Sequence, residues 1–302
     1  MSVINTGSHP KALWPGVKTW WGVEYNRYAP IWPKMFEQQT SDKNYEEEVE
    51  DVGFGLMTTK TQGSGIYYDT TQQGNVTRYT HVTFGLGYVV TMEEVQDNQY
   101  QETSFKRVSR LARSVAETQE IIHANVFNRG FNASFTGGDG VSMFNTAHPT
   151  ASGNQSNQLA VAADLSEASL EDLTVQIMLA VDSRGLRFLN KPQTLLVPPQ
   201  EWFNANRILK SEKQNDTANN AINVINQTGL FSGGIVVNPY FTDTDAFFIR
   251  TDCMDGLKHF TRMDVTFDKD NDFDTKNLKA SVVTRWSQGW TNWRQIYGSP
   301  GA

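Results

Sequence analysis

The sequence predicts a mixed α+β fold in which a very long β-hairpin leads into one long amphipathic helix. Residues 54–90 predict the hairpin, with arms Phe54–Tyr68 and Val76–Val90 around a polar turn segment at 69–75. At about 3.3 Å per residue, each arm would extend on the order of 50 Å. An isolated two-stranded ribbon is only marginally stable in water. We therefore expect another copy of the chain to supply the surface on which the hairpin lies.

The helix that follows the hairpin is predicted over residues 100–128, with Gly130 as its stop. Its length, on the order of 40 Å at 1.5 Å per residue, is typical of a structural beam. Its apolar residues recur at three- and four-residue steps, at Phe105, Val108, Leu111, Ala112, Val115, Ile122 and Val126. The other faces carry basic residues, namely Lys106, Arg107, Arg110 and Arg113. They are interpreted as a solvated helix face, with contact to nucleic acid or to acidic neighbours as the alternative.

In the second arm of the predicted hairpin, near its base, every second residue is apolar. Val82, Phe84, Leu86 and Tyr88 fall on one side of an extended strand. We expect that side to be buried. The distal part, residues 69–79, has little to bury.

The remaining elements alternate irregularly, which excludes a regular series of βαβ units. At the N-terminal end, Pro15 opens a short helix that Pro30 stops, with Trp20, Val23 and Tyr28 near one face. Further helices are predicted from Ser169 and from Trp202. Strands are predicted at 194–197, 234–237, 246–249, 263–267 and 278–286.

Composition limits the classes of function. The chain has 302 residues, a net charge of −7, one cysteine and no apolar run long enough to cross a bilayer. A protein that grips nucleic acid usually presents a basic face, so tight DNA binding is not the main task expected here. The acidic run Glu46–Asp51 is interpreted as a solvated stretch or as a partner for basic residues on an adjacent copy.

No motif for a metal, a cofactor or a phosphate is found, so none of these is expected. The histidines are scattered without metal-ligand spacing. An alternative reading is a hydrolase that uses His148 with Asp139 and Ser142, but no nucleophile-elbow pattern supports it. Lys60 in the hairpin is interpreted as a solvated lysine in preference to one that forms an isopeptide cross-link.

Several segments resemble tailed-bacteriophage major capsid proteins. One is residues 143–150 followed by Asn157-Gln158-Leu159, and another is Thr194–Pro199 leading into Trp202. The strongest resemblance lies at the end of the chain, in residues 272–278, 286–294 and 297–299. Together with the Trp-rich start, the sequence resembles a major head protein of the Hong-Kong-97-type fold over nearly its whole length.

The resemblance implies five parts and a function. An N-terminal arm would span 1–45, an extended loop 46–98, the spine helix with the first part of a peripheral domain 99–149, an axial domain 150–255, and a return into the peripheral domain 256–302. Copies would form pentamers and hexamers of an icosahedral head that encloses double-stranded DNA, with assembly in the host cytoplasm.

The resemblance also implies partners. These are other copies of the chain, a separate scaffolding protein, a portal protein, DNA held by weak non-specific contact and a possible decoration protein. Candidate contacts between subunits are Trp20, Trp21, Tyr67, Tyr68, Tyr79, Arg107, Arg110 and Arg113. Another phage structural part, a tail tube or a decoration protein, stays open as an alternative at this point.

Overall fold

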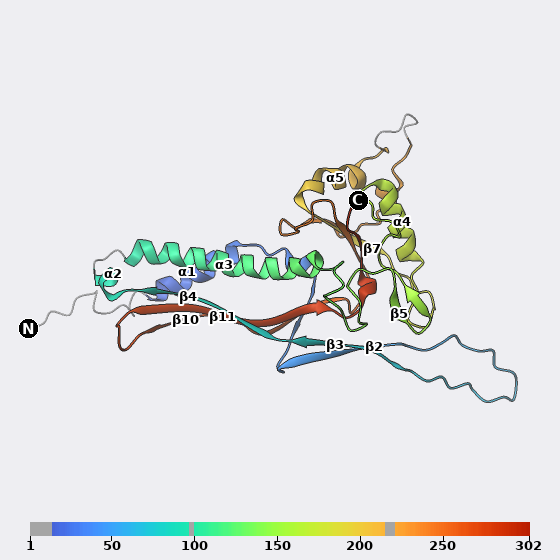
Figure 1. Cartoon of the computed structure of the whole chain (residues 1–302), viewed down its shortest axis with the longest axis horizontal. Coiled ribbons are helices and arrows are strands. Elements are labelled where there is room, and N and C mark those ends of the chain that lie inside the picture. Colours follow the sequence, from blue (N-terminus) through green and yellow to red (C-terminus); the bar gives the residue numbers. More distant parts are fainter. Residues whose placement is uncertain (1–13, 97–99, 215–220) are drawn as a thin grey trace, which may run out of the picture.

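A computed structural model describes residues 14–96, 100–214 and 221–302 of the chain. Figure 1 shows an elongated body of sheet and helix, a second part that rises from one end of it, and a hairpin and loop that project beyond both. The body carries helix α3 (Tyr100–Asn128), so the predicted long helix is confirmed at both ends. The mixed α+β class is confirmed as well.

The body is built on a four-stranded sheet with the order β1-β10-β11-β4. Its two long central strands, β10 (Leu257–Asn271) and β11 (Leu278–Trp290), form an antiparallel pair. The short strand β1 (Glu37–Thr40) pairs with β10, and β4 (Val82–Val90) pairs with β11. The short helix α2 (Met92–Gln96) connects β4 toward α3.

Helices α1 (Trp14–Arg27) and α3 cover one face of this sheet. Two of the residues predicted near one face of α1 lie on its exposed side. Trp21 is buried and stacks on Phe267 of β10 at 5.0 Å between ring centroids, whereas Trp20 and Val23 are exposed. The sheet on which so short a helix packs decides which of its faces is buried.

The second part contains a sheet with the order β12-β9-β7-β8. Its strands are β7 (Pro192–Val197), β8 (Gly234–Val237), β9 (Phe247–Thr251) and β12 (Ile296–Ser299). The predicted segment 256–302 therefore does not end wholly in the body, because β12 pairs with β9 in this sheet. Burial explains this pairing, because all of β12 and all but one residue of β9 are buried.

Helices α4 (Glu167–Met178), α5 (Trp202–Lys210) and α6 (Val224–Thr228) pack on one face of the second sheet. A capping box between Ser166 and Ser169 starts α4, three residues earlier than the start predicted at Ser169. The other face of the sheet packs on the C-terminal end of α3, where Phe127 contacts Phe248 of β9. This shared core joins the two parts. A small hairpin, β5 (His148–Thr150) with β6 (Gly153–Gln155), lies beside it.

The pairing predicted for residues 54–90 was wrong. Strand β3 (Gln73–Thr80) pairs with β2 (Tyr45–Asp51), which lies upstream of the predicted first arm, and residues 52–72 contain no strand. Strand β4, which was predicted as part of the second arm, pairs instead with β11 in the first sheet. The alternating residues of β4 fit any apolar partner, and β11 offers nine paired positions. The last part of the predicted 46–98 segment thus belongs to the first sheet.

Two buried histidines join α3 to the first sheet. His123 Nδ1 lies 2.6 Å from the carbonyl oxygen of Gln119, and His123 Nε2 lies 2.9 Å from His259 Nδ1. His259 Nε2 in turn lies 3.0 Å from Thr261 Oγ1. With both rings neutral, every donor in this series of hydrogen bonds faces an acceptor. Burial lowers the pKa of His123 to about 4 and that of His259 to about 3.

We predict that the free energy of unfolding falls by about 3–4 kcal/mol as the pH falls from 7 to 5. In that range the unfolded histidines take up protons while the folded pair stays neutral, so the unfolded state gains protons and stability decreases. Denaturant unfolding at several pH values measures this. The variant His259→Gln should have a shallower pH dependence, and a dependence as steep as that of the unaltered protein would contradict the assignment.

Among the helices that the structure describes, none combines the length and the apolar character needed to cross a bilayer.

Candidate assembly interface

The loop at residues 52–72, which connects β2 to β3, is the most exposed apolar segment described. We call it the assembly loop. In Figure 1 it projects well beyond the body. Val52 at its start is buried, but its other large apolar side chains are between 63% and 98% exposed, at Phe54, Leu56, Met57, Ile66, Tyr67 and Tyr68. A contiguous exposed apolar segment of this kind is typical of a surface that another macromolecule covers.

Polar contacts fix the base of the assembly loop to its own chain. Asp69 accepts a hydrogen bond from the backbone nitrogen of Gly55 at 2.8 Å, which brings the two limbs of the loop together. Arg184 forms an ion pair with Asp69 and donates to the carbonyl oxygen of Thr70 at 2.6 Å. The hydrogen bond from Gly55 and the Arg184 guanidinium hold the pKa of Asp69 below its usual range. The base is therefore positioned while the limbs remain exposed.

The acidic strand β2 anchors the hairpin to the body through buried cations. Glu48 forms an ion pair with Lys258, and it accepts a hydrogen bond from Thr291 Oγ1 at 3.0 Å. Asp255 approaches Lys258 to 2.8 Å on its other side. Lys258 is only 3% exposed. The acidic run was interpreted as a solvated stretch or as a contact to an adjacent copy, but these carboxylates bind cations of their own chain.

Arg294 is the second buried cation, and it joins three parts of the molecule. Its guanidinium lies 3.1 Å from Glu50 of β2 and donates to the carbonyl oxygen of Val181 at 2.9 Å. It also contacts the side chains of Gln155 and Ser183. A bidentate, planar donor of this kind can hold the hairpin, the small β5–β6 hairpin and the segment after α4 in one arrangement.

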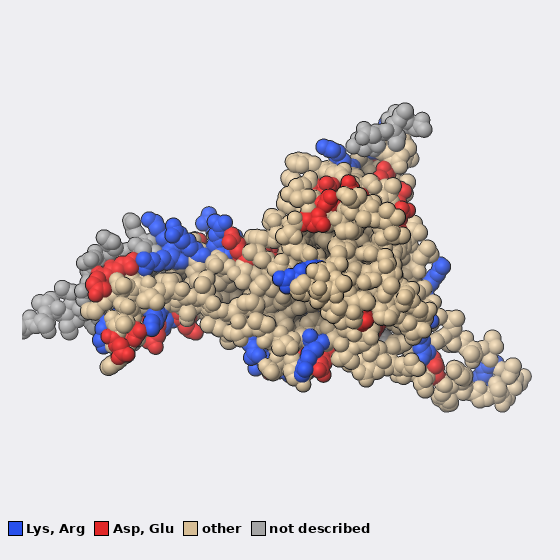
Figure 2. Space-filling model, in the orientation of Figure 1, with Lys and Arg blue, Asp and Glu red and all other residues tan. Residues whose placement is uncertain are grey.

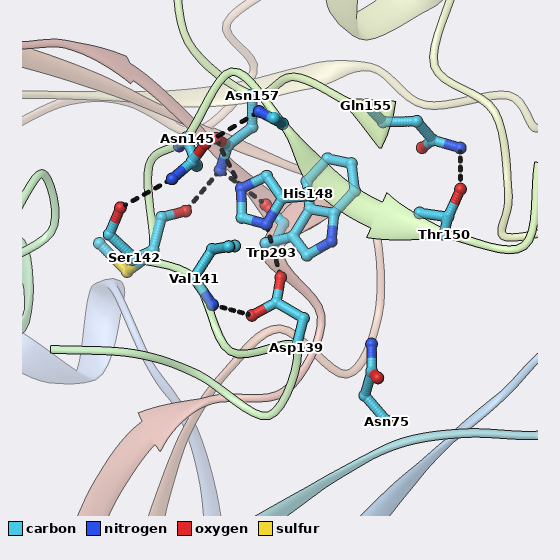
Figure 3. Close-up of polar contacts among 12 residues, drawn as sticks. Asn75, Asp139, Val141, Ser142, Asn145, His148, Thr150, Gln155, Asn157 and Trp293 are labelled. Atoms are coloured by element: carbon cyan, nitrogen blue, oxygen red, sulfur yellow. Dashed lines mark hydrogen bonds and ion pairs between the residues drawn. The ribbon is translucent and has the colours of Figure 1, made fainter. Parts of the chain in front are cut away.

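His148 lies in a buried polar cluster next to Arg294, shown in Figure 3. Its Nδ1 is 2.6 Å from Asp139 and its Nε2 is 3.1 Å from Asn157 Oδ1. Asn157 Nδ2 donates to the carbonyl oxygens of Met143 and Ile296, so its Oδ1 faces the histidine as an acceptor. The ring stacks on Trp293 with 4.2 Å between centroids. These contacts tie the loop after α3 to the C-terminal segment.

The geometry does not support the hydrolase alternative. His148 meets Asp139 as that reading required, but His148 is fully buried. Ser142 Oγ donates to the carbonyl oxygen of Phe144 and not to the histidine. No nucleophile–base pair is formed by these three residues. Within the described ranges, no group of His, Cys, Asp and Glu side chains is arranged to bind a metal ion.

The structure separates the predicted contact residues into buried and exposed ones. Trp21 and Tyr79, which were predicted as contacts between subunits, are each buried in their own chain; Tyr79 is hydrogen-bonded to Thr291 at 2.6 Å. Their aromatic character fits a core as well as it fits an interface. Tyr67 and Tyr68 lie on the assembly loop, and Trp20 is 40% exposed on α1.

The predicted basic residues lie on α3, over which Figure 2 shows Lys and Arg gathered beside acidic residues. Arg107 pairs with Glu94 at 2.9 Å and Arg113 with Glu117 at 2.7 Å, while Arg110 is exposed. Lys60 is exposed in the assembly loop. Sequence reasoning missed the anchors Lys258, Arg294 and Arg184, because each binds a carboxylate that lies more than 100 residues away in the sequence.

Comparison with known proteins decides the family. A family profile described as "Phage capsid protein" matches residues 74–298. The chain belongs to the phage capsid protein family. It is a major capsid protein that forms the shell of a phage head, and it has the Hong-Kong-97-type fold that the resemblance implied.

Solved structures agree on the fold of this capsid protein. It is similar to the virus-like particle from Pyrococcus furiosus at 12% identity with a TM-score of 0.53, covering 95% of this chain and 98% of that one. It is also similar to the capsid of the Cyanophage P-SCSP1u at 8% identity with a TM-score of 0.58, covering 91% and 88%. No curated protein sequence matched.

We predict that Arg294→Ala lowers the free energy of unfolding of this capsid protein by about 2–4 kcal/mol, because the half-buried carboxylate of Glu50 would lose its cation. Denaturant titration of the isolated subunit measures this. Arg110→Ala on the exposed face of α3 is the control and should change stability by no more than about 0.5 kcal/mol. Equal effects of the two variants would contradict the role of Arg294.

Proposed function

We propose that this capsid protein assembles into pentamers and hexamers, and that the assembly loop of each subunit lies across the next one. The observation that carries the proposal is the row of exposed apolar side chains from Phe54 to Tyr68. In water this surface is unfavourable by roughly 25 cal/mol for each Å² that a neighbour could cover. If every subunit makes the same contact with the next one, a ring can close with a single kind of interface.

The parts of the molecule suggest a role for each segment in the shell. Residues 1–45 would act as an N-terminal arm, of which α1 packs on the body. The hairpin β2–β3 and the assembly loop would form the extended loop, α3 the spine, and the first sheet the peripheral domain. The second sheet with α4, α5 and α6 would form the axial domain, whose edges would meet around the symmetry axes of the rings.

Further partners follow from the same proposal. The shell would enclose double-stranded DNA, and Arg110 on α3 would offer it a weak, non-specific contact. The net charge of −7 favours such loose contact over tight binding. A separate scaffolding protein would guide assembly in the host cytoplasm, a portal protein would occupy one vertex, and a decoration protein could bind the outside. The finished protein would reside in the virion.

Electron microscopy of assembled particles tests the proposal. We expect closed icosahedral shells whose capsomers have five-fold and six-fold symmetry. Tubes would support the alternative of a tail protein. Small discrete particles under all assembly conditions, with a scaffolding protein present, would contradict a shell-forming role.

We predict that the double substitution of Tyr67 and Tyr68 by Ala leaves the subunit folded and reduces the yield of shells at least tenfold. Both side chains are exposed, so their loss costs the subunit little but removes apolar contact area from each interface. The measurement is shell yield by sedimentation, with circular dichroism as the check on folding. Val161 and Leu189, exposed at 79% and 93% outside the loop, give a matched double alanine control. Unchanged yield would remove the loop from the assembly mechanism.

A further inference from the structure

One strand of the first sheet has an apolar face that its own chain leaves half uncovered. The helical layer reaches β10 through Trp21 and β11 through Val115 of α3, which lies against Val282. Strand β4 is the outer strand of this sheet. On the same face as the helices, Val82 and Leu86 of β4 remain 52% and 48% exposed. The prediction that this side of the strand is buried is therefore only partly met.

A cavity of about 260 Å³ opens between β4, β11 and α3 beside these residues. We call the cavity, together with the exposed face of β4, the β4 groove. Phe84 and Trp286 stack within it at 4.1 Å between centroids. Its lining contains no charged residue and consists of Phe84, Gly85, Leu86, Ser114, Val115, Thr118, Val282, Thr284 and Trp286.

The side chain of Trp286 makes the β4 groove aromatic on one side. Trp286 is 2% exposed, and its indole Nε1 is buried with no hydrogen-bond partner among the described residues. Buried indole N–H groups usually have an acceptor, and an unmade hydrogen bond costs free energy. Because Nε1 is closed to solvent, the groove offers an incoming residue the rings of Phe84 and Trp286 rather than that donor, and these rings favour an aromatic side chain over an aliphatic one.

The assembly loop has the matching chemistry. Its apolar side chains include the aromatic rings of two tyrosines, which are 67% and 85% exposed. Residues 52–72 contain only two charged side chains, Lys60 and Asp69, and Asp69 is already paired with Arg184. Contact between the loop and the groove would thus bury little charge on either side.

A chain cannot place its own loop in its own groove. In Figure 1 the assembly loop projects from one end of the molecule, whereas β4 runs from the base of the hairpin toward the other end. The contacts of Asp69 and Arg184 hold the base of the loop in that direction. A second copy can bring its loop to the groove.

From these observations we infer that the β4 groove receives the assembly loop of the neighbouring copy, with the ring of Tyr67 or Tyr68 in the cavity beside Trp286. The inference rests on the proposed function, because it names the surface that the loop covers in the shell. The ring would pack against Phe84 and Trp286, and the apolar limbs of the loop would cover Val82 and Leu86.

Photo-cross-linking in assembled shells tests the inference. The photoreactive residue p-benzoylphenylalanine replaces Tyr68, the particles are irradiated, and mass spectrometry identifies the attached peptide. We expect covalent links between subunits that map to residues 82–90 or 114–118. Links to any other segment of the neighbour, or to another protein, would overturn the groove. Microscopy before irradiation keeps the two claims apart: shells with the loop attached elsewhere refute the groove alone, and absence of shells from the unaltered chain refutes both.

Two substitutions in β4 give a second test that needs no photoreactive residue. Leu86→Glu and Val89→Glu change side chains of nearly equal exposure, 48% and 51%, on opposite faces of the strand. We expect the isolated subunits to be similarly stable, and the yield of shells to fall at least tenfold for Leu86→Glu relative to Val89→Glu. Equal yields for the two variants would overturn the inference.

Discussion

The ion pairs between the acidic strand β2 and two buried cations determine how the rest of the molecule is arranged. Lys258 and Arg294 lie at the junction of the two sheets, and each binds a carboxylate of β2. Removal of either cation would leave a carboxylate with little access to water, which is costly. The hairpin therefore leaves the body in one direction, and the assembly loop at its end is carried away from the surfaces of its own chain.

Because the hairpin points away from the body, the apolar side chains of the assembly loop remain exposed to water. An ordinary monomer would fold such a loop back over its own sheet, and the half-covered face of β4 would be a suitable place for it. The present fold separates the two surfaces instead. A subunit built in this way is stable through the apolar cores of its described residues, of which three are large, yet it retains two incomplete surfaces that a ring of identical copies can cover.

The sequence was most informative where structure is local. The long helix was predicted at both ends, because its periodicity and the following Gly130 are properties of neighbouring residues. The strand pairing was not predictable in this way. Val82–Val90 has the pattern of a hairpin arm, but its partner β11 lies near the other end of the chain, and nothing within residues 54–90 indicates that choice.

The predicted contact residues were likewise only partly recognisable from the sequence. Tyr67 and Tyr68 were predicted as contacts and are exposed, whereas Tyr79, from the same segment and of the same residue type, packs against Phe260 in the interior. Residue type alone does not distinguish these positions, since burial is set by distant strands. The anchoring cations are single residues whose carboxylate partners lie far away in sequence, so only the folded chain brings them together.

Hydrogen–deuterium exchange of residues 52–72, compared between the isolated subunit and the assembled shell, tests the central claim most directly. We expect fast exchange throughout the assembly loop in the isolated subunit and strong protection in the shell, with little change in α3. Equal exchange in the two states, or a loop already protected in the isolated subunit, would contradict this claim.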